Sequence, residues 1–160
     1  MNISVYFRDK IRLLYLKMIR EKASPEYIAR GWAIGMFFGC FAPLGTQLFC
    51  SIPCSFLLRG SKIGATFGTL LTNHFTIFFI YPVQCWVGNR ILGGELTFHA
   101  VRDALKLLLQ EKSPEALLEL KTEIVNAFFT GGLLLALVLT PLTYYVVLTL
   151  VKQARLRKLR

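Results

Sequence analysis

The fold is decided by an uncharged stretch at residues 31–58, which reads GWAIGMFFGCFAPLGTQLFCSIPCSFLL. As one straight helix this stretch would be about 42 Å long, at about 1.5 Å per residue. The hydrocarbon core of a bilayer is only about 30 Å thick. Near the centre lies Ala42-Pro43-Leu44-Gly45, in which proline removes a backbone donor and glycine permits a sharp turn. We therefore expect two half-helices separated by a break at Pro43 and Gly45.

Two further uncharged runs follow, at residues 63–89 and 124–151. Each is longer than the roughly 20 apolar residues that are needed to span a bilayer. Only 18% of the 160 residues are charged, which is low for a soluble domain of this size. The sequence therefore predicts one all-α integral membrane domain over residues 1–160, with a transmembrane helix at residues 124–151.

An internal repeat relates the first uncharged run to the second. Residues 31–39 (GWAIGMFFG) and residues 60–68 (GSKIGATFG) are identical at five of nine positions, at an offset of 29. Each copy carries three glycines spaced by four, which form a smooth ridge that lets two helix backbones approach closely. We expect the packing of these ridges to hold the two breaks beside each other. The expected helix-packing residues are Gly31, Gly35, Gly39, Gly60, Gly64 and Gly68.

The second broken segment covers residues 60–90, with its polar break at residues 72–76. Backbone that is broken inside a membrane must be satisfied by protein or by a wet cavity. Transporters often build ligand sites from such discontinuous helices, and an arginine at the end of each segment is suited to a phosphate or a lipid head group. The expected ligand-binding residues are Pro43, Gly45, Gln47, Arg59, Asn73, His74, Thr76 and Arg90.

Basic residues flank the apolar runs. Seven Lys/Arg precede Gly31 and five lie in the tail at residues 152–160. Residues 1–22 have the pattern of a basic amphipathic helix at the membrane interface, and residues 95–123 that of amphipathic helices outside the membrane. Because cytoplasmic flanks are rich in Lys/Arg, both termini are expected in the cytoplasm.

Two termini on one side require an even number of crossings. Three apolar segments satisfy this condition if one of the two broken segments is re-entrant, and the sequence does not indicate which. If both broken segments instead cross once, they are inverted repeats, and the inference from the charged tails is wrong.

The composition also bears on partners and chemistry. The net charge of +10 points to anionic membrane lipids and not to nucleic acid, since no recognition module accompanies it. Cys50 and Cys54 share a helix face, but no His or acid lies beside them at ligand spacing, so we expect no metal. The apolar runs contain no Asp or Glu, and no nucleophile and base can be paired from their spacing. We therefore expect neither a cofactor nor an enzyme activity.

Several of these residues together are similar to a known pattern. They are Ser24-Pro25-Glu26, Ile28-Ala29, Gly31, Ala33-Ile34-Gly35, Phe37, Gly39, Pro43, Gly45, Gln47, Arg59, Asn73, Thr76, Tyr81, Gly88 and Arg90. The pattern resembles the bacterial membrane family catalogued as domain of unknown function 2062, over roughly residues 20–95 and on into the last span. The resemblance implies a multi-pass protein of the bacterial cytoplasmic membrane, and it implies no reaction.

The chain departs from the family pattern at two positions. His74 stands where the family motif resembles Asn-Pro-x-Thr, so the second break is softer or gains a titratable group. Ser61 stands where the family tends to carry asparagine, two residues after the arginine.

Three functions fit the sequence to different degrees. The leading hypothesis is a protein that binds, and transports, a lipid head group or a small anionic solute at the paired breaks, as a homo-oligomer because three segments enclose little. The alternative is a non-catalytic scaffold for an envelope or lipid-modifying enzyme, in which residues 1–22 and 95–123 contact a membrane partner protein. A third hypothesis, a membrane enzyme acting on a lipid phosphate with His74 as base, would be removed by full function in His74→Ala.

The amides near the breaks provide a first test. Because they would supply hydrogen bonds to a polar ligand, the double variant Gln47→Ala/Asn73→Ala is expected to lose ligand binding while still inserting into the membrane. Binding by the purified protein and fractionation of the membranes measure the two properties. Unchanged binding would remove both residues from the site.

Deletion of residues 1–22 separates the leading hypothesis from the alternative. If the protein is a scaffold, the deletion should abolish binding of its partner protein. If it is a transporter, the deletion should reduce transport comparatively little.

Overall fold

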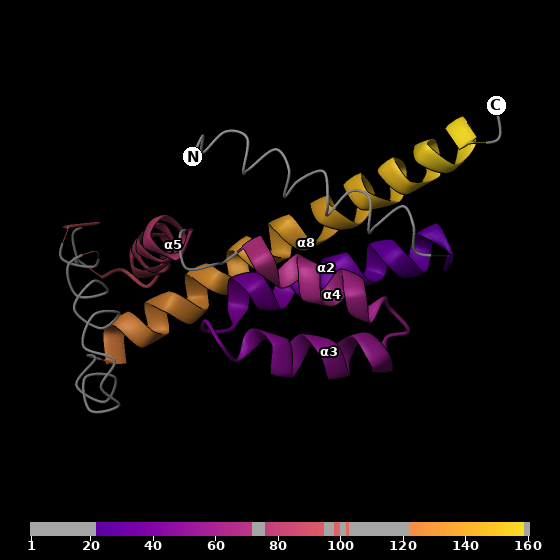
Figure 1. Cartoon of the computed structure of the whole chain (residues 1–160). Helices are drawn as coiled ribbons and strands as arrows, with labels where there is room; N and C mark the ends of the chain where they lie inside the picture. The colour runs from indigo at the N-terminus through magenta and orange to yellow at the C-terminus, as the bar shows by residue number, and fades with distance from the viewer. Residues whose placement is uncertain (1–21, 72–75, 95–97, 100–101, 103–121, 159–160) are drawn as a thin grey trace, which may run out of the picture.

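The computed structural model describes residues 22–71, 76–94, 98–99, 102 and 122–158 (Figure 1). The regular elements among these residues are all helical, which confirms the expected class for this part of the chain. The segments predicted as helices over residues 1–22 and 95–123 fall almost entirely outside it. In chain order the elements are α2 (Pro25–Phe41), α3 (Gln47–Leu57), α4 (Lys62–Gly68), a 3-10 turn η1 (Thr69–Leu71), α5 (Ile77–Ile91) and α8 (Thr122–Lys158).

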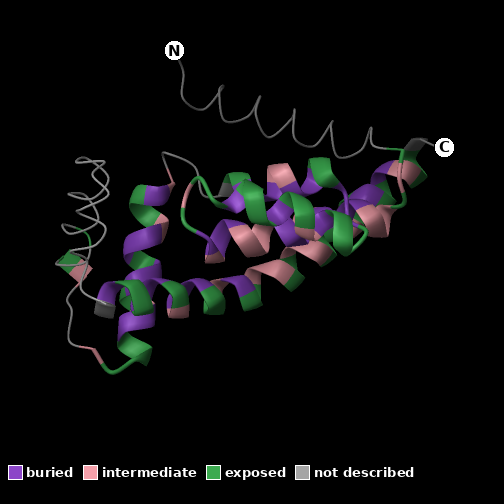
Figure 2. Ribbon diagram, turned by 90° about the horizontal axis from the view of Figure 1, so that it is seen from below, coloured by how far each residue is buried: buried purple, intermediate pink, exposed green. Residues whose placement is uncertain are grey.

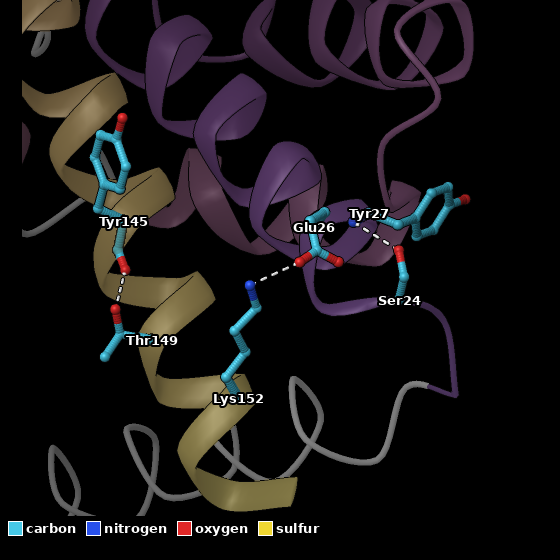
Figure 3. Close-up of polar contacts among 6 residues, drawn as sticks. All are labelled: Ser24, Glu26, Tyr27, Tyr145, Thr149 and Lys152. Atoms are coloured by element: carbon cyan, nitrogen blue, oxygen red, sulfur yellow. Dashed lines mark hydrogen bonds and ion pairs between the residues drawn. The ribbon is translucent and has the colours of Figure 1, made fainter.

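Helix α2 begins where the sequence predicts a helix start. The Tyr27 backbone N–H donates to the Ser24 hydroxyl over 3.2 Å, which satisfies one free amide of the first turn (Figure 3). Pro25 occupies the first helical position, where its missing N–H costs nothing. Glu26 adds a negative charge near the positive end of the helix dipole.

The first uncharged run is broken at the predicted place. Helix α2 ends at Phe41 and α3 begins at Gln47. Gly45 has a φ of 97°, and a Cβ built there would meet nothing within 4 Å, so the position requires glycine for its conformation and not for lack of space. Helix α3 then runs back alongside α2 and α4 (Figure 1). The first segment is therefore a helical hairpin.

A tight turn ends α3 and leads into α4. The Gly60 N–H donates to the Ser55 carbonyl over 2.7 Å and the Arg59 N–H to the Phe56 carbonyl over 3.3 Å. These two bonds form a Schellman motif, which satisfies free carbonyls at the end of a helix. Ser61 caps α4 by accepting from the Gly64 N–H over 2.8 Å, and its own N–H donates to the Tyr27 carbonyl over 3.0 Å. The turn thus lies beside the start of α2.

The two glycine ridges lie against each other, one on α2 and one on α4. A Cβ at Gly68 would lie 2.5 Å from the Trp32 carbonyl oxygen and 2.8 Å from the Gly35 Cα. A Cβ at Gly60 would lie 3.0 Å from the Gly31 nitrogen. At such distances the two backbones touch directly, which only glycine allows.

The repeat is less symmetric in the structure than in the sequence. Helix α2 has 17 residues, whereas α4 has seven and continues as η1. The two arginines that follow the apolar units are not equivalent, because Arg59 lies in the turn after α3 and Arg90 lies inside α5. A matching order of residues in the sequence therefore does not place these two side chains in matching positions.

Helix α8 is continuous over 37 residues, with Pro141 inside it. Its residues Ile124–Arg157 form the one helix in the described ranges that is long and apolar enough to cross a membrane. The basic tail that we expected as a separate segment at residues 152–160 continues this helix as far as Lys158, since lysine and arginine are good helix formers. Helix α8 packs along α2, and α5 lies across α8 (Figures 1 and 2).

The end of α8 is joined to the start of α2 by polar contacts. The Lys152 ammonium lies 2.9 Å from the Glu26 carboxylate (Figure 3), and the Arg155 guanidinium donates to the Ala23 carbonyl. The hydrogen bond from Lys152 holds the pKa of Glu26 below its ordinary value. Because the folded-state pKa is lowered, this contact contributes to stability at neutral pH and is lost as the pH falls through that pKa.

Two glycines one turn apart on α2 test the ridge contact. A Cβ at Gly35 would lie 2.8 Å from the Gly68 Cα, whereas the nearest atom to a Cβ at Gly39 is the Thr69 Cα at 3.3 Å. Overpacking costs about 1–3 kcal/mol, and alanine in a helix recovers about 1 kcal/mol over glycine. Gly35→Ala is therefore expected to lower the free energy of unfolding clearly more than Gly39→Ala does, measured by unfolding in detergent. Equal effects would contradict the close packing of α2 on α4.

Candidate functional site

Helix α3 has polar residues on its buried face and apolar residues on its exposed face. Its buried residues Gln47, Ser51 and Ser55 recur every four positions and so share one face. On the opposite face Phe49 is 82% exposed and Leu57 is 77% exposed. A surface helix in water has the reverse arrangement. The outer face of α3 is therefore suited to an apolar environment or to an apolar partner.

Gln47 substitutes for the backbone donor that Pro43 lacks. In a continuing helix the Gly39 carbonyl would accept from the N–H of residue 43, but proline has none. The Gln47 Nε2 donates instead to the Gly39 carbonyl over 3.4 Å and to the Ala42 carbonyl over 3.2 Å. Gln47 is only 4% exposed, so these bonds form away from solvent. The side chain of Gln47 thus stabilises the broken end of α2.

Tyr81, in the first half of α5, points at the same break. Its hydroxyl faces the Leu44 backbone and the Gln47 side chain. The ring packs edge-on against Phe128 of α8, with 4.9 Å between the ring centroids. Although Tyr81 is only 6% exposed, its hydroxyl completes no hydrogen bond with the described residues. Its position joins α5 to the break after α2.

Gln84 lies one turn further along α5 and is fully buried. Its Nε2 donates to the Phe128 carbonyl over 2.9 Å, while its Oε1 has no partner in the described part of the chain. A Cβ built at Gly132 would lie 2.5 Å from the Gln84 Nε2 and 2.8 Å from the Cys40 carbonyl oxygen. The amide of Gln84 therefore lies where α5, α8 and the last turn of α2 meet.

We call Gln47, Tyr81 and Gln84, together with the break at Pro43–Gly45, the junction. Leu44 packs there against Ile77 and other apolar residues of α5 and α8. Helices α3 and α5 both begin here, and at neither N-cap does the side chain accept from an N–H of the first helical turn. The positive ends of two helix dipoles thus lie close to buried amide and hydroxyl groups, an arrangement that favours a polar ligand with negative charge.

The structure brings together only part of the residue set that the sequence predicted. Pro43, Gly45 and Gln47 form the break, and Thr76 directly precedes α5. The predicted roles of Asn73 and His74 fall outside the described residues.

The structure does not bring the two arginines to the junction. Arg59 follows the far end of α3, and the 11 residues of that helix measure about 16 Å. Arg90 is exposed in the last turn of α5, and its guanidinium carbon lies 5.9 Å from the centre of the Trp86 ring. The single site that the sequence suggested is therefore divided among separate places.

Gln84 was missed by reasoning from the sequence, and Tyr81 was noted only as part of the family pattern. The signal was present, because the polar and small residues of this segment share one helix face. Tyr81, Gln84 and Gly88 recur at intervals of three and four and are buried, while the nearby Phe79 and Val83 are exposed. A search for polar residues at helical spacing inside the uncharged run would have found this face.

The described junction can bind a ligand through hydrogen bonds and helix dipoles. The described residues hold no group of three or more His, Cys, Asp or Glu that could bind a metal. The four cysteines are free thiols, and Cys40 and Cys85 are buried. The chemistry that the described junction supports is recognition of a polar group by amides, a hydroxyl and backbone atoms.

The two buried glutamines should differ in how much stability is lost when their amides are removed. Gln47→Leu removes the donor to two buried carbonyls and is expected to lower the free energy of unfolding by about 1–3 kcal/mol. Gln84→Leu removes one donor to a single buried carbonyl, that of Phe128, together with an acceptor that has no partner in the described residues, so it is expected to lower stability less than Gln47→Leu does. Chemical unfolding in detergent micelles measures both. A loss at Gln84 as large as the loss at Gln47 would show that the Gln84 oxygen is bonded in the folded protein.

Comparison with known proteins places the chain in a family. The family model described as an uncharacterized protein conserved in bacteria (DUF2062) matches residues 9–160. No curated protein and no solved structure matches the chain. The match extends well beyond the residues that carry the sequence resemblance, and it includes all of α2, α3, α4, α5 and α8. This chain belongs to the bacterial DUF2062 family.

Proposed function

We propose that this chain is a multi-pass protein of the bacterial cytoplasmic membrane that binds a lipid head group or a small anionic solute at the junction and carries it across. The observation that supports this proposal is the burial of the Gln84 Oε1, which has no hydrogen-bond partner in the described residues and lies near the break after α2. Buried polar atoms in native proteins are nearly always paired, so an unpaired acceptor at this place points to a bound group.

In this proposal the hairpin of α2 and α3 is the re-entrant segment. Its two helices measure about 25 Å and 16 Å, and neither matches the roughly 30 Å of a hydrocarbon core. Both ends of the hairpin lie at the end of the molecule that also carries the basic end of α8 (Figure 1). The chain would then cross once from α4 to α5 and return through α8, which leaves both termini in the cytoplasm.

The exposed side chains fit this placement. The outer face of α3 would lie against lipid. Most of α8 would do the same, because few residues of its apolar stretch are buried inside the protein. The inner face of α3, with Gln47 and Ser51, would line the path to the junction. Broken helices with polar inner faces are a recurring way to build ligand sites in membranes.

The free groups of the junction suggest what the ligand carries. The Gln84 Oε1 accepts hydrogen bonds, so it suits a hydroxyl donor. The N-termini of α3 and α5 favour a negative group such as a phosphate. A group with both properties, as in a glycerol-phosphate head group, would satisfy the junction better than a simple anion. A homo-oligomer or a membrane partner protein would complete the enclosure that this short chain lacks.

The alternative function, a non-catalytic scaffold for an envelope or lipid-modifying enzyme, relies on residues 1–22 and 95–123. These segments lie almost wholly outside the described residues, and no described contact favours it. The junction also does not favour an enzyme, because its described side chains pair no nucleophile with a base.

The proposal is tested by binding of sn-glycerol 1-phosphate to the purified protein and by its uptake into proteoliposomes. Gln84→Leu and Tyr81→Phe are each expected to weaken binding by roughly tenfold, the equivalent of one hydrogen bond of about 1.4 kcal/mol. The matched control is Gln153→Leu, because Gln153 is an exposed glutamine at the far end of α8. Undiminished binding in both junction variants would refute the site. Binding without uptake would restrict the function to recognition.

A further inference from the structure

The turn between α3 and α4 gathers cationic side chains from two parts of the chain. Arg59 and Lys62 lie in the turn or directly after it, and Arg30 reaches it from α2. The Arg30 guanidinium donates to the Leu58 carbonyl over 3.1 Å. The Ser61 N–H donates to the Tyr27 carbonyl over 3.0 Å, so the turn is held against α2 at two points. The backbone of the turn is therefore fixed beside Arg30, which brings the three cationic residues into one region.

Arg59 adopts a backbone conformation that disfavours its own side chain. Its φ is 52°, and no other non-glycine residue in the described ranges has a positive φ. The corresponding position of a Schellman motif is usually glycine, because any Cβ is strained there. The equivalent position after α5 is occupied by Gly93, with a φ of 74°. An arginine at this position costs stability, which indicates that its guanidinium has a use.

The surroundings of the turn combine this charge with exposed apolar surface. Phe56 is 68% exposed, Leu57 is 77% exposed and Ile63 is 51% exposed. The Lys62 Nζ lies 5.1 Å from the centre of the Phe56 ring. A soluble anion or a nucleic acid would use only the cations. A phospholipid uses both surfaces, because its phosphate meets the cations while its acyl chains cover the apolar side chains.

No described acid competes for these cations. Glu26, the described acid at this end of the molecule, is already paired with Lys152 over 2.9 Å. The end of α8 adds further positive charge, since Arg155 lies against the start of α2 and Arg157 follows it. The electrostatic potential at this end is therefore strongly positive, as for segments that bind anionic lipid.

We propose that the α3–α4 turn is a binding site for the phosphate of an anionic phospholipid, with Arg59 as its main ligand and Lys62 and Arg30 beside it. The site is separate from the junction, which lies at the opposite end of α3. The inference rests on the membrane placement given under the proposed function, but not on what the junction binds. A lipid bound here would hold the tip of the turn at the head-group level and so set the depth of the hairpin.

The test is the affinity of the full-length protein for phosphatidylglycerol, titrated in a non-ionic detergent and followed by native mass spectrometry. A basic residue at an anionic lipid surface contributes about fivefold in affinity. Arg59→Gly is expected to bind phosphatidylglycerol about fivefold more weakly, and Arg59→Gly combined with Lys62→Gln about 25-fold more weakly. In detergent without lipid the unfolding temperature of Arg59→Gly should be unchanged or higher, because glycine relieves the backbone strain.

Two controls separate this site from other sources of binding. Arg102→Gln removes one charge from an exposed residue outside the turn and should keep the affinity of the original chain. The junction is followed separately by the binding of sn-glycerol 1-phosphate, which Arg59→Gly should leave unchanged, so that a failure of the junction is distinguishable from a failure of the turn. Phosphatidylcholine should bind much more weakly than phosphatidylglycerol.

Several results would overturn the proposal. Unchanged affinity in Arg59→Gly would do so, as would equal binding of phosphatidylcholine. If Arg59→Gly loses affinity and unfolding temperature together, the arginine has a structural role only. Competition by inorganic phosphate as strong as that by the lipid would show that the apolar side chains contribute nothing. Tighter binding of a polyglutamate peptide than of phosphatidylglycerol would assign the surface to an acidic protein.

Discussion

The architecture depends on one missing hydrogen-bond donor, the backbone N–H that Pro43 lacks. Without it the Gly39 carbonyl cannot continue the helical ladder, so α2 ends and the chain reverses through Gly45. The reversal places Gln47 at the start of the returning helix, where its amide donates to the Gly39 carbonyl, which the proline leaves open, and to the Ala42 carbonyl. Such a repair is obligatory in an apolar environment, because no water is present to bond the exposed carbonyls. The junction is therefore a direct consequence of this single residue.

The hairpin is stable only because glycine allows its neighbours to come close. Contacts between the backbones of α2 and α4, and between those of α5 and α8 at Gly88 and Gly131, leave no room for side chains. Within lipid, dense contact of this kind would take the place of the hydrophobic effect, which does not drive one helix onto another there. It also buries the polar inner faces of α3 and α5 in a place that water does not reach. The Gln84 oxygen, which has no partner in the described residues, is a local cost of this packing, and a bound ligand would offset it.

Two chemically different regions lie at the two ends of α3. One end combines the junction with the N-termini of two helices, and the other combines the strained Arg59 with the ion pair of Glu26 and Lys152. If lipid phosphate fixes the turn at the cytoplasmic surface, the junction lies about 16 Å deeper, near the middle of a bilayer. The length of α3 would then decide how deep the polar site lies.

The sequence by itself determined the helical class, the break at Pro43 and Gly45, the start of α2 at Ser24 and the pattern of the glycine ridges. These features follow from local chemistry: a residue without an N–H, a residue without a Cβ, and a cap. The tertiary structure alone decided which of the polar residues meet. It joined Gln47 to Tyr81 and Gln84, separated Arg59 from all three, and gave Arg59 and Arg90 unlike positions in spite of the repeat. The reason is that the direction in which a chain returns after a break, and the helix that it then packs against, depend on contacts between residues far apart in the sequence.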